Sequence, residues 1–456
     1  MAAGYTTLAA AVGGSGIWWM TTSRDQTKQM PHFDGAPTGQ LAAALGPSKE
    51  DVSRILSQGA YSVPVTHIPG LNRYDGSQVA SNNPCEDRFV HGELPSPRDD
   101  GGRWAAWAVF DGHAGWQTAD LLEKQLLPFV RDSLMQAKPA LGKGSAAIDD
   151  AVQDAIIRAF VKLDDAIMNT VSDTIESKIP LQDKLAKLMP GYSGSCALLS
   201  MYDPLTSTLH VACTGDSRAV LGRKRPDGTW EAVPLSLDQT GRNPQEFARL
   251  EKEHPGEENM VTKDGRVLGI AVSRAFGDGR WKWSVDMQKD LYRRFQAPAL
   301  LPSKYDVRTP PYLTAEPVVT STKIDASRPS FLIMASDGLW DRLTSQQAVD
   351  LVGKWLDMGA LGKENSEPEP TYETLDFHQL RSLKAASPRY VEERATFKDD
   401  NAAVHLTRNS LGGNHHGLIA ARLAYNAPFS RHLRDDITVQ VVFFGNKGVG
   451  KPGRSA

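Results

Sequence analysis

The chain has 456 residues, of which 40% are hydrophobic and 23% are charged, a composition typical of a soluble globular protein with a large core. The formal net charge of −3 argues against nucleic acid as a partner, because surfaces that bind it carry excess positive charge. Three cysteines, Cys85, Cys196 and Cys213, are too few for a disulfide framework and lack paired metal-ligand spacing, which favours a reducing compartment.

Residues 1–20 carry no charged side chain and are rich in alanine and glycine. They reach the lower length limit of a membrane span, and they lack the basic start of a secretory signal and the arginines of a transit peptide. Two interpretations stay open: a membrane anchor or processed leader, and a disordered or packed tail. We predict a leader and linker over 1–50, one domain over 51–445, and a flexible tail over 446–456.

The first clear strand signal is a run of seven apolar residues, 104–110, which is too short for a helix of its own. Residues 88–93 predict a short strand before it, and the sequence PSPRDDGG at 95–102 predicts the turn between the two. We therefore expect an antiparallel pair formed by 88–93 and 104–110.

The tip of this predicted pair carries acidic residues. The apolar run ends in Asp111-Gly112-His113, and Glu86-Asp87 precedes the other strand. Antiparallel pairing would bring both acidic sites to the same end of a sheet. A carboxylate at the tip of a buried strand is costly to desolvate unless it is paired or binds a metal. Asp111 is therefore either a metal ligand or the cap of the helix that follows.

Helical spacing of apolar residues predicts two core-facing helices, over 116–137 and 148–171. A second β region follows, with strands expected over 195–201, 207–213 and 218–222. Asp216 lies in the tight turn between the last two, where an Asp is also common for purely structural reasons.

The last third repeats the pattern of an apolar strand that runs into Asp-Gly, at Asp337, and the final strand, 437–444, starts at Asp435. Next to an antiparallel neighbour, the start of that strand would lie at the same edge. The remaining predictions are helices over 345–356 and 401–410, a loop with a short helix and a Gly-rich segment over 236–283, and insertions over about 284–311 and 358–398.

Six carboxylates thus lie at predicted strand ends: Glu86, Asp87, Asp111, Asp216, Asp337 and Asp435. If they cluster, they repel one another unless cations neutralise them. A cluster of oxygen ligands suits Mg²⁺ or Mn²⁺ better than Zn²⁺. Two such ions about 3.5–4 Å apart would activate a water for displacement at phosphorus.

These motifs resemble those of the metal-dependent protein serine/threonine phosphatases of type 2C. The resemblance covers about residues 80–445, and its specificity lies in the ordered set of motifs rather than in any one of them. In sequence order they are ED at 86–87, FDGHAG at 110–115, GYSGS at 191–195, TGDSRA at 214–219, AVSRAFGD at 271–278, SDGLWD at 336–341 and RDDITV at 434–439. The resemblance implies an α+β fold: a four-layer α-β-β-α sandwich of two central antiparallel sheets, with a dinuclear metal site at one end.

The resemblance also implies roles for individual residues. Asp111 would bridge two Mg²⁺ or Mn²⁺ ions, and Gly112 would offer its carbonyl to one of them. Asp337 and Asp435 would complete the ligands of the first ion.

Four more residues match positions with roles in that family. Glu86 and Asp87 would hold the ions directly or through water, and Asp216 would bind a third, weaker ion. His113 would be the general acid that protonates the departing serine oxygen, which fits a group that titrates near neutral pH.

One position departs from the common pattern. Many family members have an arginine that holds the substrate phosphate four residues before the Glu, and here Asn82 stands there. An amide donates hydrogen bonds but offers no bidentate charge pairing, so Asn82 would bind phosphate more weakly. The same substitution, together with residues 274–289 and 311–317, resembles the mitochondrial pyruvate dehydrogenase phosphatases.

Membership of that branch would imply a mitochondrial matrix or inner-membrane location and a phosphoserine of the pyruvate dehydrogenase complex as substrate. Association with a membrane through residues 1–20 would agree with such a location. Proteins of the branch also respond to calcium and bind a regulatory subunit, for which we find no motif.

Other classes fit less well. A cysteine-based phosphatase needs Cys-x5-Arg, and none of the three cysteines has an arginine at that spacing. The glycine- and lysine-rich residues 445–451 nearly match a phosphate-binding loop, but Pro452 replaces the Ser or Thr that would hold Mg²⁺. A general type 2C phosphatase with other substrates remains an alternative, as does a non-catalytic pseudophosphatase, although the latter should have lost metal carboxylates.

Overall fold

The apolar strands assemble into two antiparallel sheets that pack face to face. The structure is a computed structural model, and it describes residues 46–98, 100–137, 145–297, 300–325, 327–360 and 390–445. The first sheet contains, in spatial order, β1 (Tyr61–Pro64), β2 (Leu71–Val79), β14 (Ile437–Phe444), β13 (Ser330–Ala335), β9 (Arg218–Lys224) and β10 (Trp230–Pro234). The second contains β12 (Val318–Lys323), β8 (Thr208–Thr214), β7 (Ala197–Asp203), β4 (Arg103–Phe110) and β3 (Arg88–Pro95).

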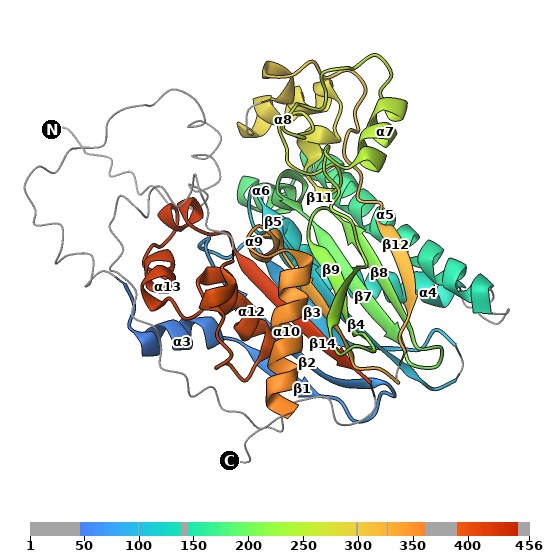
Figure 1. Ribbon diagram of the computed structural model, residues 1–456. Helices are drawn as coiled ribbons and strands as arrows, with labels where there is room; N and C mark the ends of the chain where they lie inside the picture. The colour runs from blue at the N-terminus through green and yellow to red at the C-terminus, as the bar shows by residue number, and fades with distance from the viewer. Residues whose placement is uncertain are drawn as a thin grey trace, which may run out of the picture.

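Helices cover the outer face of each sheet, which gives four layers (Figure 1). The first sheet is covered by α3 (Lys49–Ser57), α10 (Ser345–Ala360) and α12 (Ala402–Leu411), and the second by α4 (Gln117–Ala137) and α5 (Ser145–Glu176). Fully buried side chains such as Trp107 and Leu332 fill the space between the sheets. The predicted α+β sandwich is therefore confirmed.

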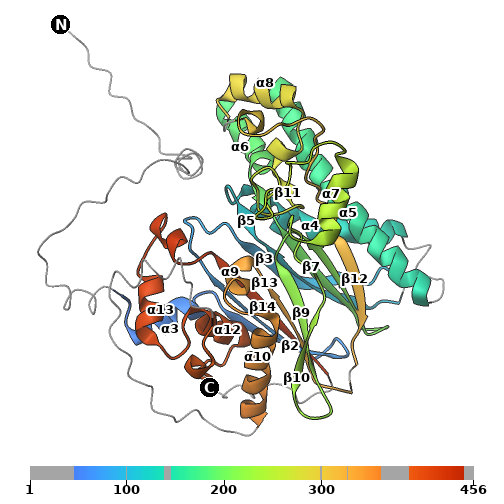
Figure 2. The same ribbon diagram turned by 45° about the horizontal axis from the view of Figure 1, so that its top comes forward.

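Shorter elements gather at one end of the sandwich. Figure 2 shows α6 (Leu181–Tyr192), α7 (Pro244–Glu253) and α8 (Val285–Phe295) together there. A small sheet of β11 (Phe276–Gly277), β6 (Gly194–Ser195) and β5 (Gly112–His113) lies at the same end. The remaining elements are α9 (Asp337–Trp340), α13 (His416–Leu423), η3 (Gly279–Trp281), η4 (Leu301–Ser303), η5 (Glu392–Arg394) and η6 (Phe429–His432).

Strand pairing sets the positions of the acidic residues. In the β3–β4 pair Arg88 lies opposite Phe110, so Asp87 and Asp111 flank the same end, as predicted. In the β13–β14 pair Ala335 lies opposite Val439, which places the segment after β13 beside the start of β14. Both pairings are antiparallel, so strand ends and strand starts meet at one edge.

Several elements differ from the expectations. β1, β2, β10 and α6 were not predicted, and residues 284–311 contain α8 and η4 where the sequence showed few structural cues. Helix α8 is amphipathic and buries Leu291. Residues 1–45, most of the predicted insertion 358–398, and the predicted tail 446–456 lie outside the described residues. Among the helices of the described ranges, none has both the length and the apolar character that a bilayer crossing requires.

Candidate metal centre

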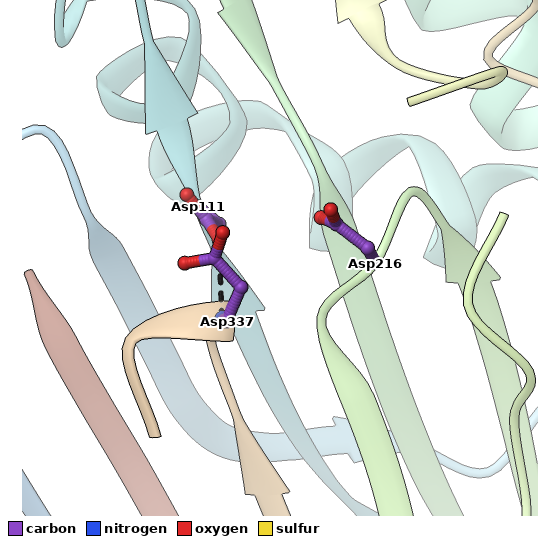
Figure 3. Close-up of side chains that lie close together, drawn as sticks. All are labelled: Asp111, Asp216 and Asp337. Atoms are coloured by element: carbon purple, nitrogen blue, oxygen red, sulfur yellow. Dashed lines mark hydrogen bonds between the residues drawn. The ribbon is translucent and has the colours of Figure 1, made fainter. Parts of the chain in front are cut away.

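Three carboxylates from distant parts of the sequence meet at one end of the sandwich. Asp111 follows β4, Asp216 follows β8, and Asp337 is the first residue of α9, just after β13. One carboxylate oxygen of each lies within 4.8 Å of those of the other two (Figure 3). Each side chain is partly buried. The sheets thus bring together three of the six acids predicted at strand ends.

The hydrogen bonds around these three acids leave one buried oxygen without a donor. The backbone N–H of Asp337 donates to Oδ2 of Asp111 at 3.3 Å, and the Cys196 thiol donates to Oδ1 of Asp216 at 3.3 Å. Within the described part of the chain, Oδ1 of Asp337 is buried and has no hydrogen-bond partner. A buried oxygen without a donor is unfavourable, and a bound cation would satisfy it.

The protonation of the three acids reflects burial and mutual repulsion. Burial raises the pKa of each, and neighbouring carboxylates raise the pKa of Asp111 and Asp337 further, to well above the usual range. Such a cluster is stable in its ionised form only with a counter-cation. Because the side chains of this cluster offer carboxylate oxygens as metal ligands, they fit Mg²⁺ or Mn²⁺.

Glycine is required next to two of the strand tips. A Cβ at Gly112 would overlap the carbonyl oxygen of Glu86, and a Cβ at Gly338 would overlap that of Asp436. The Asp-Gly pairs therefore allow the segments that carry Glu86 and Asp436 to pack directly against the strand ends.

Asp87 lies beside the three acids and is almost completely buried. Its Oδ2 accepts hydrogen bonds from Ser336 Oγ at 2.8 Å and Thr438 Oγ1 at 2.7 Å. Burial, together with the charge of Asp436, raises the pKa of Asp87 to about 7. Its own charge in turn raises the pKa of Asp111, so it belongs to the same electrostatic group.

Asp436 organises the loop that carries Glu86 and Asn82. Its carboxylate accepts hydrogen bonds from the backbone N–H groups of Ser81, Asn82 and Glu86, the last at 2.8 Å. The Asn82 side-chain amide donates to Asp436 Oδ2 at 2.9 Å and lies 3.4 Å from Glu86 Oε2. Burial raises the pKa of Glu86. The predicted phosphate-binding amide is thus already engaged within the loop.

Asp435 does not join the group of three acids. Its carboxylate forms an ion pair with Arg431, which lies on η6 and has a side chain 26% exposed. The charge of Arg431 also counters burial by lowering the pKa of Glu86, and it acts in the same direction on Asp337. Arg431 is therefore a cation at the edge of the acidic cluster.

His113 is held by a second carboxylate. Its Nε2 lies 2.6 Å from Oδ2 of Asp278, which precedes η3. Burial alone would lower the pKa of His113, but the charge and hydrogen bond of Asp278 outweigh it and raise that pKa. A Cβ at Gly194 would overlap both side chains, so this glycine allows their contact.

Three functional candidates were missed at the level of sequence: Asp436, Arg431 and Asp278. Asp436 stands in the Arg-Asp-Asp motif and Asp278 ends the motif at 271–278, so each was visible without an assigned role. Nothing in the sequence pattern marked Arg431.

Comparison with known proteins agrees with this geometry. The family model described as Protein phosphatase 2C matches residues 76–370, so the chain belongs to that family. It is a metal-dependent protein serine/threonine phosphatase. Over 381 residues it is 46% identical to a protein phosphatase 2C homolog of Schizosaccharomyces pombe, which covers 83% of this chain and 81% of that protein.

Two further relatives carry a more specific name. The mitochondrial [pyruvate dehydrogenase [acetyl-transferring]]-phosphatase 1 of Saccharomyces cerevisiae is 36% identical over 405 residues, covering 83% of this chain and 70% of the relative. The Homo sapiens protein of that name is 30% identical over 470 residues, covering 88% of this chain and 83% of the relative.

Proposed function

We propose that this phosphatase is mitochondrial and removes phosphate from a phosphoserine of pyruvate dehydrogenase. The observation that carries the proposal is the similarity to yeast and human pyruvate dehydrogenase phosphatases along more than four fifths of the chain. The Asn82 substitution agrees with it. The same assignment predicts that the protein associates with a membrane through residues 1–20. It also predicts that the protein binds a regulatory subunit.

The acidic cluster would hold two Mg²⁺ or Mn²⁺ ions. Asp111 and Asp337, with Asp435, would provide the carboxylates of this site, and Gly112 would add its carbonyl. Glu86 and Asp87 would hold the ions directly or through water, and Asp216 would bind a third ion. When bound, such ions supply an activated water and neutralise charge on the phosphoryl group.

His113 would donate the proton that the departing serine oxygen needs, because an alkoxide is a poor leaving group. Asp278 supports this role in two ways. It orients the ring through the contact at 2.6 Å, and it raises the pKa of His113 so that more of the imidazole is protonated near neutral pH. The proton would leave from the other ring nitrogen, Nδ1, because Nε2 faces Asp278.

Arg431 is better placed than Asn82 to bind the phosphoryl oxygens. The Asn82 amide is held by Asp436 and Glu86, whereas Arg431 is partly exposed at the cluster and paired only with Asp435 among the described acids. Cations bound at Asp435 would compete with that ion pair and free the guanidinium. A guanidinium can bind two phosphoryl oxygens at once.

A general type 2C phosphatase with other substrates is the second candidate. It is favoured by the 46% identity to the S. pombe protein, whose name specifies no substrate. Release of phosphate from phosphorylated pyruvate dehydrogenase and from unrelated phosphoproteins, measured with Mn²⁺, separates the two. We expect the dehydrogenase to react much faster, whereas equal rates would refute the substrate assignment. Location is tested separately by fractionation of the cells.

A further inference from the structure

A group of buried arginines lies near the start of β14. Arg342, Arg422 and Arg434 are only 8%, 3% and 8% exposed. Their side chains donate to backbone carbonyl groups, at 2.5 to 2.8 Å for the shortest bond of each. In the described ranges none of the three forms an ion pair with a carboxylate, and Nη1 of Arg342 and Nε of Arg434 have no hydrogen-bond partner.

Other buried arginines of the molecule do have carboxylate partners. Arg408, on α12, is 2% exposed and pairs with Asp399 at 2.7 Å. Arg274 is 8% exposed and pairs with Glu246 at 2.7 Å. Because a buried charge is normally paired, the arginine group is the exception that needs a counter-ion.

The positive charges of these arginines also repel one another. Burial lowers the pKa of Arg422 to about 9, and the charges of Arg342 and Arg394 act in the same direction. The charge of Asp436 partly offsets that of Arg434. A guanidinium nevertheless stays protonated in proteins. Arg422 is therefore a buried cation, and in the described ranges its side chain donates to the backbone carbonyl oxygens of Ser410 and Leu411.

A small pocket opens at this place, between η5, α12 and α13. Helices α12 and α13 lie side by side in both views (Figures 1 and 2). Arg394 and Arg422 line the pocket together with the polar side chains of Tyr390, Asn409 and Ser410. Its volume of about 10 Å³ is near the smallest that holds one water-sized particle.

We propose that this pocket between η5, α12 and α13 binds a monatomic anion, chloride, as the counter-ion of Arg422, the member of the buried arginine group that lines the pocket. The volume favours a single halide over a whole phosphate group. The lining of the pocket includes none of the proposed metal- or substrate-binding residues. The pocket borders the start of β14 because Arg434 donates to the backbone carbonyl oxygen of Arg422. A bound anion would therefore stabilise the packing of α12 and α13 against this strand.

The direct test uses the unmodified full-length protein with bromide as the probe. Crystals soaked in bromide should show an anomalous-scattering peak beside the Arg422 guanidinium. Absence of bromide there, in crystals that show bromide at other sites, would overturn the proposal. This measurement needs no variant and does not depend on phosphatase activity.

Thermal unfolding gives an independent test in solution. At constant ionic strength, replacing gluconate by chloride should raise the unfolding midpoint until it saturates, and phosphate should not reproduce the rise. Arg422→Met should abolish the chloride-specific rise. Arg408→Met, which removes an arginine that already has a carboxylate partner, should lower the midpoint but keep the rise. A midpoint of the wild-type protein that is the same in gluconate and chloride would refute the site, and a rise in phosphate alone would refute the halide.

Discussion

Without metal, the clustered acids repel one another, so a variant that lacks one of them should be more stable than the wild-type protein. Asp87→Asn is the informative substitution, because asparagine keeps an oxygen that can accept the hydrogen bonds of Ser336 and Thr438. It removes only the charge that burial and Asp436 disfavour. In the presence of EDTA, the variant should therefore unfold at a higher urea concentration than the wild type.

The size of this effect follows from the pKa of Asp87, which rises from 3.8 to about 7 in the folded protein. One pKa unit corresponds to about 1.4 kcal/mol, so ionised Asp87 costs on the order of 4 kcal/mol above pH 7. The raised pKa means that this cost is absent below pH 3.8 and grows until the pH passes about 7. The advantage of the variant should thus shrink to roughly 2 kcal/mol at pH 5.

Urea unfolding at pH 8 and pH 5, with EDTA and with saturating Mn²⁺, measures these differences. Mn²⁺ should reverse the order, because the cation stabilises the wild-type carboxylate. Asp203→Asn is the matched control: this carboxyl is also buried, but Arg98 outweighs burial and lowers its pKa. Its substitution should destabilise the protein at pH 8. An Asp87→Asn variant no more stable than wild type in EDTA at pH 8 would refute the reasoning.

Three further outcomes are expected. Asp278→Asn should lower the pKa of His113 and move the alkaline limb of the kcat profile to lower pH, and an unchanged limb would exclude His113 as the titrating acid. Arg431→Ala should raise the KM for a phosphoserine peptide more than it lowers kcat. Substitution of the exposed Arg54 by alanine should change neither constant. An unaltered KM in Arg431→Ala would contradict phosphate binding by Arg431. Gly112→Ala should lower the free energy of unfolding by about 1–3 kcal/mol and weaken Mn²⁺ binding. Gly92→Ala should do neither, because a Cβ at Gly92 meets open space. Calorimetric titration with Mn²⁺ measures the change in metal binding.

The sequence predicted the strand ends well because burial leaves a strong local signal there. The apolar run of β4 ends directly at Asp111, and that of β13 ends with one residue between it and Asp337, so their strand type and the position of the acids could be read together. Antiparallel pairing then accounts for their meeting. The predicted strands and helices of the sandwich were largely recovered for the same reason.

The remaining features depend on contacts between distant residues. β2 was missed because its sequence, LNRYDGSQV, is mostly polar. In the fold it pairs with β14, and its buried Asp75 forms an ion pair with Arg73 and accepts a hydrogen bond from the backbone N–H of Ala402. The two acids of the Arg-Asp-Asp motif look alike in sequence, and only the structure separates Asp435, paired with Arg431, from Asp436, which binds the loop. Such tertiary pairing leaves no periodic pattern to detect.

The central claim is that the clustered carboxylates carry a metal-dependent phosphatase reaction. The most direct measurement is Mn²⁺-dependent release of phosphate from a phosphoserine peptide by the wild type and by Asp111→Asn, compared side by side. We predict turnover by the wild type that EDTA abolishes, and a loss of at least 100-fold, roughly, in the variant. Metal-independent turnover, or equal turnover by a folded Asp111→Asn protein, would contradict the account.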